Sequence, residues 1–136
     1  MTPDSNIYQS RDFLNKLAAF LQPLLGSHGF RFESEYEAIS SGGPFANGYF
    51  IHEQIRIGLI YRQDRLGCVI YEGKGRNLTH GEMFKALGKE KEQKLLYDAN
   101  RFSSYTHSES GVYMALWSDL ETVILPFLEH TPAEGI

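Results

Sequence analysis

The sequence has almost no means of covalent or metal cross-linking. Cys68 is the only cysteine among 136 residues, so an intrachain disulfide cannot form. A chain of this length can bury roughly two-thirds of the surface that its unfolded form exposes, and it needs no cross-link to fold. The sequence therefore predicts a single domain over residues 1–136, with an ordered core from about residue 8 to about residue 129.

Long apolar runs and an excess of basic residues are also missing. No segment approaches the roughly 20 apolar residues expected of a membrane-spanning helix, and the N-terminal segment lacks the pattern of a secretory signal. With 17 acidic and 13 basic residues, the formal net charge is -4. This balance gives no electrostatic reason to expect nucleic acid or a membrane as a partner. These absences predict a cytoplasmic protein.

The histidines show no metal-binding spacing, because none of the five stands four residues from another. We therefore expect no metal and no cofactor. His52 ends a predicted strand beside Glu53, where catalytic groups often occur. An enzyme that used His52 or His80 with a carboxylate would need these groups to converge in one cleft. Since the sequence has no catalytic motif, it favours a protein that is not an enzyme.

What the chain does have is clear apolar periodicity. Residues 10–26 carry an apolar stripe at the helical period, with Ser10 as a capping residue, Gly26 at the end and Pro23 in conflict. Alternating apolar and polar residues then predict four strands, at 30–38, 46–52, 55–61 and 66–72. Their short connections favour an antiparallel meander, because parallel neighbours need long crossovers.

The C-terminal half is predicted to be helical. Thr79 and Glu82 match a capping box that begins a short helix, and Gly88 ends it. A further helix is predicted over 89–102, a loop over 103–110, and a last helix from about Gly111 with Pro126 near its end. The expected fold is a two-layer α+β domain: an N-terminal helix, a four-stranded antiparallel meander and two to three C-terminal helices.

The alternation within the strands predicts the two sheet faces. Glu33, Glu35 and Glu37 alternate along the first strand and are expected to face water. Cys68 is expected to face the core, where a thiol is a poor nucleophile. The face not used by Ile57 and Leu59 also carries apolar and aromatic residues, which form a candidate interface: Tyr49, Ile60, Val69 and Tyr71. A sheet that is apolar on both faces needs a second cover, from a helix or from another subunit.

Two glycine-containing loops give an alternative hypothesis. The loops could present backbone N–H groups to an anion or small ligand, although neither matches the phosphate-loop pattern. Tight turns explain the same glycines. The candidate ligand-binding residues are Gly42, Gly43, Lys74, Arg76 and His52.

The chain also resembles a group of small uncharacterised bacterial proteins over roughly residues 10–128. The residues that carry this resemblance are the runs GGPFANGYF at 42–50, LIYR at 59–62, LGCVIY at 66–71, LTH at 78–80 and FKAL at 84–87. The resemblance implies no activity. The helix–meander–helix layout is more loosely similar to immunity proteins that neutralise secreted bacterial toxins. The leading hypothesis is a non-enzymatic interaction domain, accessory or immunity-type, that binds a protein partner or itself through an aromatic sheet face.

Overall fold

The computed structural model describes residues 3–40, 43–62, 65–73, 75–98, 104–105 and 109–130. The N-terminal half comprises α1 (Pro3–Ser27), β1 (Arg31–Ser40), β2 (Gly43–His52), β3 (Ile55–Arg62), β4 (Arg65–Gly73) and β5 (Arg76–Thr79). The remainder comprises α2 (His80–Ala86), the 3₁₀ turn η1 (Glu90–Glu92), β6 (Tyr97–Asp98), β7 (Ser104–Tyr105), α3 (Glu109–Asp119), the π-helical turn η3 (Leu120–Ile124) and α4 (Leu125–His130).

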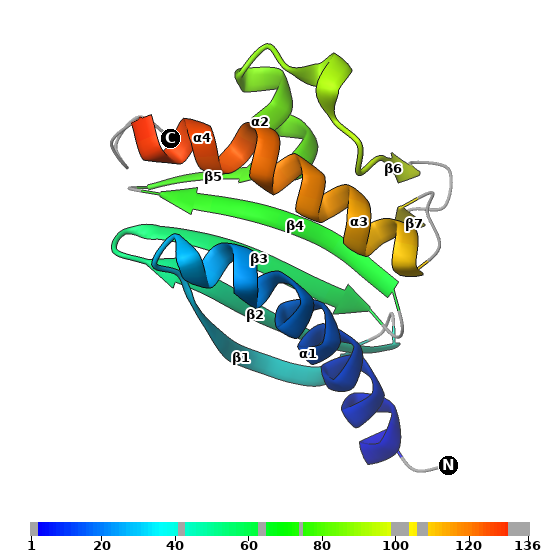
Figure 1. Cartoon of the computed structure of the whole chain (residues 1–136). Helices are drawn as coiled ribbons and strands as arrows, with labels where there is room; N and C mark the ends of the chain where they lie inside the picture. Colours follow the sequence, from blue (N-terminus) through cyan, green and yellow to red (C-terminus); the bar gives the residue numbers. More distant parts are fainter. Residues whose placement is uncertain are drawn as a thin grey trace.

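Strands β1 to β5 form one sheet in sequence order, and each strand is antiparallel to the next. Helix α1 and the continuous helix α3–η3–α4 lie on the same face of this sheet (Figure 1). The predicted α+β fold, with an N-terminal helix, an antiparallel meander and C-terminal helices, is therefore confirmed. Strand β5 was not predicted, because its four residues are too short for a period of two to show.

The core lies between the sheet and this helical layer. Helix α1 contributes a row of buried leucines: Leu14, Leu17, Leu21, Leu24 and Leu25. The sheet contributes Phe50, Ile57, Leu59, Tyr61, Val69 and Tyr71. Burial of one such side chain contributes about 1.5–3 kcal/mol relative to full exposure. The apolar stripe of α1 thus packs against the apolar face of the sheet.

Helix α1 extends beyond both predicted ends. Pro3 can occupy its first turn, where a backbone N–H would have no intrahelical partner. Pro23 lies inside the helix, which continues to Ser27. The sequence analysis expected Gly26 to be the left-handed residue that ends the helix. The residue with this conformation is instead Gly29 (φ 90°). A Cβ on Gly29 would come within 2.9 Å of the His52 ring, so glycine is needed there for space as well.

Two irregularities in register decide which residues share a face. In β1, Ser34 is opposite Gly48 but Tyr36 is opposite Asn47, so Glu35 is an extra residue. The next glutamate, Glu37, is paired with Ala46, whereas Glu33 is paired with Tyr49, so the alternation along β1 is shifted by one residue. The prediction that residues 33, 35 and 37 share one face is wrong, because a bulge reverses the alternation.

The second irregularity lies in β4. Ile60 is opposite Cys68, but Tyr61 is opposite Leu66, so Gly67 is the extra residue. Val69 and Tyr71 consequently lie in the core, both with 0% exposure, and not on the outer face where the sequence placed them. Cys68, predicted to face the core, lies on the outer face instead. Glycine tolerates the local backbone distortion that a bulge requires.

The predicted helix over 89–102 is wrong in its described part. Only Glu90–Glu92 form a single 3₁₀ turn, and β6 follows at Tyr97–Asp98 and pairs with β7. Residues 99–102 lie outside the described part. A buried carboxylate explains the outcome: Asp119 accepts hydrogen bonds from the N–H groups of Lys94 and Leu95, which an α-helix would use internally.

The last helix accommodates Pro126 through a π-helical turn. The N–H of Leu125 donates to the carbonyl of Leu120, five residues earlier, immediately before the proline. A wider turn of this kind relieves the missing hydrogen bond and the steric conflict that a proline introduces. By length and composition alone, 111–128 could cross a membrane, which the sequence analysis did not anticipate. In this fold Leu116, Leu120 and Ile124 are fully buried in the core.

Candidate functional site on the open sheet face

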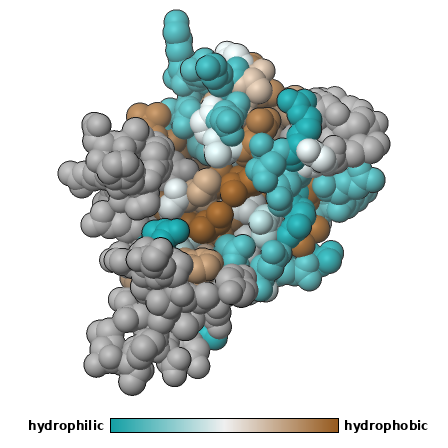
Figure 2. All heavy atoms as spheres, turned by 180° about the vertical axis from the view of Figure 1, so that it is seen from behind, coloured by the Kyte–Doolittle hydropathy of each residue, from teal (hydrophilic) through white to brown (hydrophobic). Residues whose placement is uncertain are grey.

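The second face of the sheet, turned away from α1 and α3, is covered by no helix or strand in the described part of the chain. We call it the open sheet face. Its half-buried side chains come from alternate positions of three strands: Phe45, Asn47, Tyr49, Ile51, Arg56, Ile60, Cys68, Ile70 and Glu72. Figure 2, a view from behind Figure 1, shows hydrophobic residues gathered in the middle of this side, with hydrophilic residues next to them.

Arg56 and Tyr49 form the centre of the open sheet face. The guanidinium carbon of Arg56 lies 3.8 Å from the centroid of the Tyr49 ring, a cation–π stack. Gly58 is directly opposite Tyr49 in the sheet, and a Cβ there would come within 2.7 Å of the ring. The ring therefore lies over Gly58, where only glycine leaves this space.

Two glutamates flank Arg56. Its Nη2 donates to Glu35 Oε2 at 2.6 Å, and its Nε lies 3.8 Å from Glu72 Oε2. Glu35 is the bulge residue of β1. Arg56 Nε and Glu72 Oε2 are both covered by neighbouring atoms, and neither makes a hydrogen bond within the described chain. Half-exposed ion pairs contribute little to stability, but they fix the orientation of the guanidinium plane.

The electrostatic surroundings keep Tyr49 protonated. Burial raises the pKa of the Tyr49 hydroxyl, and the nearby charges of Glu72 and Glu35 raise it further, while Arg56 and Asn47 oppose them. The hydroxyl is therefore a hydrogen-bond donor throughout the neutral range. Burial also raises the pKa of the Cys68 thiol, with a smaller contribution from Glu82. This thiol is a poor nucleophile at neutral pH.

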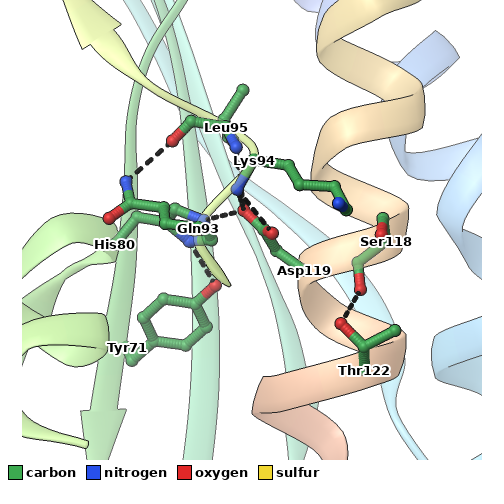
Figure 3. Close-up of polar contacts among 8 residues, drawn as sticks. All are labelled: Tyr71, His80, Gln93, Lys94, Leu95, Ser118, Asp119 and Thr122. Atoms are coloured by element: carbon green, nitrogen blue, oxygen red, sulfur yellow. Dashed lines mark hydrogen bonds and ion pairs between the residues drawn. The ribbon is translucent and has the colours of Figure 1, made fainter. Parts of the chain in front are cut away.

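A second cluster, the buried polar network, joins Tyr71, His80 and Asp119 inside the protein (Figure 3). The Tyr71 hydroxyl lies 2.7 Å from His80 Nδ1, and His80 Nε2 lies 2.9 Å from Asp119 Oδ2. The Asp119 carboxylate also accepts from the N–H groups of Lys94 and Leu95, both at 2.9 Å. One imidazole nitrogen therefore faces the Tyr71 hydroxyl, and the other faces the Asp119 carboxylate.

The connectivity of this network matches that of a hydroxyl–histidine–carboxylate relay, but its location does not. Tyr71 and Asp119 have 0% exposure and His80 has 1%, so no substrate can reach the hydroxyl. A nucleophile must be within reach of a reacting atom. The network instead ties together β4, α2, the segment at 94–95 and α3. His80 therefore meets a carboxylate, as the enzyme hypothesis requires, but in the core and not in a cleft.

His52 has a local structural role. Its Nδ1 lies 3.1 Å from the Gly29 carbonyl, and its ring packs on Phe30 with centroids 5.4 Å apart. These contacts hold the end of β2 against the turn that follows α1. Within the described residues, no three His, Cys, Asp or Glu side chains are grouped closely enough to hold a metal ion.

The predicted ligand-binding residues do not come together. Gly43 begins β2 and His52 ends it, and the pairings His52–Ile55, Ile55–Gly73 and Gly73–Arg76 place Arg76 at the His52 end of the sheet. A strand of ten residues is roughly 30 Å long, so Gly43 and Arg76 cannot hold one small ligand. Gly42 and Lys74 lie outside the described residues.

Of the predicted interface residues, the structure keeps Tyr49 and Ile60 on the open sheet face and moves Val69 and Tyr71 into the core. Sequence reasoning missed Arg56, although a lone cation in the apolar run Ile55-Arg56-Ile57 was a usable signal. No protein-family model matches the chain, and no curated protein or solved structure matches it.

Proposed function

We propose that this protein is a non-enzymatic binding domain, and that its open sheet face docks a protein partner through Tyr49 and Arg56. The observation that carries the proposal is the 3.8 Å stack of Arg56 on Tyr49 in the middle of a sheet face that no described element covers. Tyrosine and arginine are enriched among the residues that dominate binding energy at protein interfaces.

The two side chains are already ordered for binding. The Tyr49 ring has its place over Gly58, and the hydrogen bond to Glu35 holds the Arg56 guanidinium. Side chains that are ordered before association lose less conformational entropy when a partner arrives. Apolar neighbours on the same face can exclude water around this centre once it is covered: Ile51, Ile60 and Ile70.

The polar groups of the described chain also favour binding over catalysis. The histidine–carboxylate pair is buried in the core, and the raised pKa of Cys68 disfavours the reactive thiolate. An open, mixed apolar and charged surface of this kind is typical of a docking site for a macromolecule.

Affinity capture from the cells that make this protein tests the proposal. Wild-type protein is immobilised beside Tyr49→Ala and Arg56→Ala, with Lys85→Ala on the exposed side of α2 as the matched control. We expect one or more proteins to be retained by the wild type and by the control and lost from both open-face variants. Retention that is equal on all four proteins would overturn the proposal. A captured secreted toxin would narrow the function to the immunity type.

A further inference from the structure

We propose that residues 90–96, between α2 and β6, form a strap that opens and closes as one unit on the folded protein, with Asp119 as its latch. The strap is attached to the core by one fully buried side chain, Leu95, and by two backbone N–H groups that share one carboxylate. This device involves the buried polar network and is independent of the open sheet face and of the binding function proposed for it.

The strap contributes little to the core. In Figure 1 it runs from the end of α2 to β6, outside the sheet and the layer formed by α1 and α3. Of its seven residues only Leu95 is buried, with 0% exposure, while the adjacent Leu96 is 49% exposed. An element that places a single side chain in the core exposes little apolar surface when it detaches. We therefore expect its opening to cost much less free energy than global unfolding.

Short-range contacts hold the strap together. In its 3₁₀ turn, the N–H of Glu92 donates to the carbonyl of Lys89 at 2.9 Å. The side chain of Gln93 donates from Nε2 to the carbonyl of Leu95 at 2.8 Å (Figure 3). These contacts lie within the segment or at its start, so they can persist while the strap moves away from the core.

Both ends of the strap are fixed by hydrogen bonds of their own. Helix α2 ends in a turn where the N–H groups of Gly88 and Lys89 donate to the carbonyls of Lys85 and Phe84, at 3.0 and 2.9 Å. Gly88 has φ 68°, and this pair of bonds is the Schellman arrangement that commonly ends a helix. At the other end, β6 pairs with β7. Opening of the strap breaks neither anchor, so the motion is confined to 90–96.

Asp119 holds the strap closed. Its carboxylate oxygens accept from the N–H of Lys94, at 2.9 and 3.1 Å, and from the N–H of Leu95, at 2.9 Å. Away from water such bonds are stronger than they are at the surface. Opening exchanges them for bonds to water and uncovers the Asp119 carboxylate, which has 0% exposure when the strap is closed. The open state therefore gives solvent access to one end of the buried polar network.

Amide hydrogen exchange followed by NMR tests whether the strap opens on its own. The amides of Lys94 and Leu95 report on the strap, and those of Ile57 and Leu59 in β3 report on global unfolding. In the wild type we expect the strap amides to be less protected than the β3 amides by about tenfold or more. Phe50→Leu leaves a cavity beside β2 and should speed the exchange of the β3 amides about tenfold, while the strap amides keep their wild-type rates.

Strap amides that are as protected as the β3 amides, or that speed up equally with them in Phe50→Leu, would overturn the proposal. Either result would mean that the strap opens only when the whole protein unfolds. This comparison needs no variant in the network itself, so it remains decisive even if a network variant does not fold.

Asp119→Asn tests the latch. The amide offers one acceptor oxygen in place of two, so the strap amides should exchange about tenfold faster than in the wild type. Glu121→Gln, an exposed position on the same continuous helix, is the matched control and should leave their rates unchanged. Trypsin cleavage after the exposed Lys91 of the native protein should rise in Asp119→Asn and stay constant in Glu121→Gln and Phe50→Leu. Wild-type strap exchange in an Asp119→Asn protein that circular dichroism shows to be folded would also overturn the proposal.

Discussion

His80 Nε2 and Asp119 Oδ2 lie 2.9 Å apart in the core, although 39 residues separate the two in the sequence. The carboxylate has no access to water and is compensated by three donors: the imidazole and the N–H groups of Lys94 and Leu95. A buried charge is tolerated only when such donors surround it. The Asp119 side chain therefore holds both α2 and the segment at 94–95 against α3.

Asp119→Asn should lower the free energy of unfolding by about 3 kcal/mol, because an amide brings two N–H groups toward donors that need an acceptor. Urea unfolding monitored by the fluorescence of Trp117 measures the loss. Glu121→Gln removes a charge from an exposed position two residues away and should change stability by less than about 0.5 kcal/mol. Equal effects of the two substitutions would contradict a structural role for the network.

Tyr71→Phe should cost about 1–2 kcal/mol, since the ring keeps its packing while His80 Nδ1 loses its buried partner at 2.7 Å. Combined with Asp119→Asn, the loss should be smaller than the sum of the single losses, because both residues act through His80. A double-mutant cycle in urea checks this. Strict additivity would show that the two hydrogen bonds are energetically independent.

Gly58→Ala should leave the fold intact and displace the Tyr49 ring, since the new methyl group would lie 2.7 Å from that ring in its present position. The ring is at the surface and can rotate, so we expect an unfolding free energy within about 1 kcal/mol of the wild type. Binding through the open sheet face should weaken at least tenfold. Gly81→Ala, where a Cβ meets nothing within 4 Å, is the matched control and should leave binding unchanged. Full binding by Gly58→Ala would show that the Tyr49 stack is not needed.

The capping box of α2 predicts a dependence of stability on acid pH. Hydrogen bonds from the Thr79 backbone and side chain lower the pKa of Glu82 below its usual value. A carboxylate with a lowered pKa in the folded state stabilises the fold above its unfolded-state pKa, and this stabilisation is lost as the pH falls through the folded-state value. Stability measured against pH should therefore fall less steeply in acid for Glu82→Gln than for the wild type. Parallel curves would contradict the capping contact.

The sequence predicted correctly those features that depend only on residues close together in the chain. The capping box at Thr79 and Glu82 was correct because all of its atoms lie within four residues. The predicted faces of Val69 and Tyr71 were wrong because Gly67 forms a bulge. A bulge depends on how the strand pairs with its neighbour, which the sequence of one strand does not show. The prediction of a helix over 89–102 was wrong for the same kind of reason, since the acceptor for residues 94 and 95 is 24 to 25 residues away.

The residues of the candidate site were likewise predicted only in part. Tyr49 and Ile60 were placed on the outer face by strict alternation, which holds through β2 and most of β3. The contact of Glu35 with Arg56 could not be predicted, because it depends on how β1, β2 and β3 pair and not on the alternation within one strand. The buried network has no sequence signal, because residues 71, 80 and 119 form no motif.

The position of Asp119 also matters while the chain is being made. Translation delivers β1 to β5 and α2 long before α3, so His80 and the N–H groups of Lys94 and Leu95 leave the ribosome without their acceptor. Until α3 arrives, the sheet also lacks part of the helical layer that lies over it in Figure 1. A nascent chain that stalls before Asp119 therefore exposes apolar surface on both sides of its sheet, which makes it prone to aggregation and a substrate for chaperones and proteases.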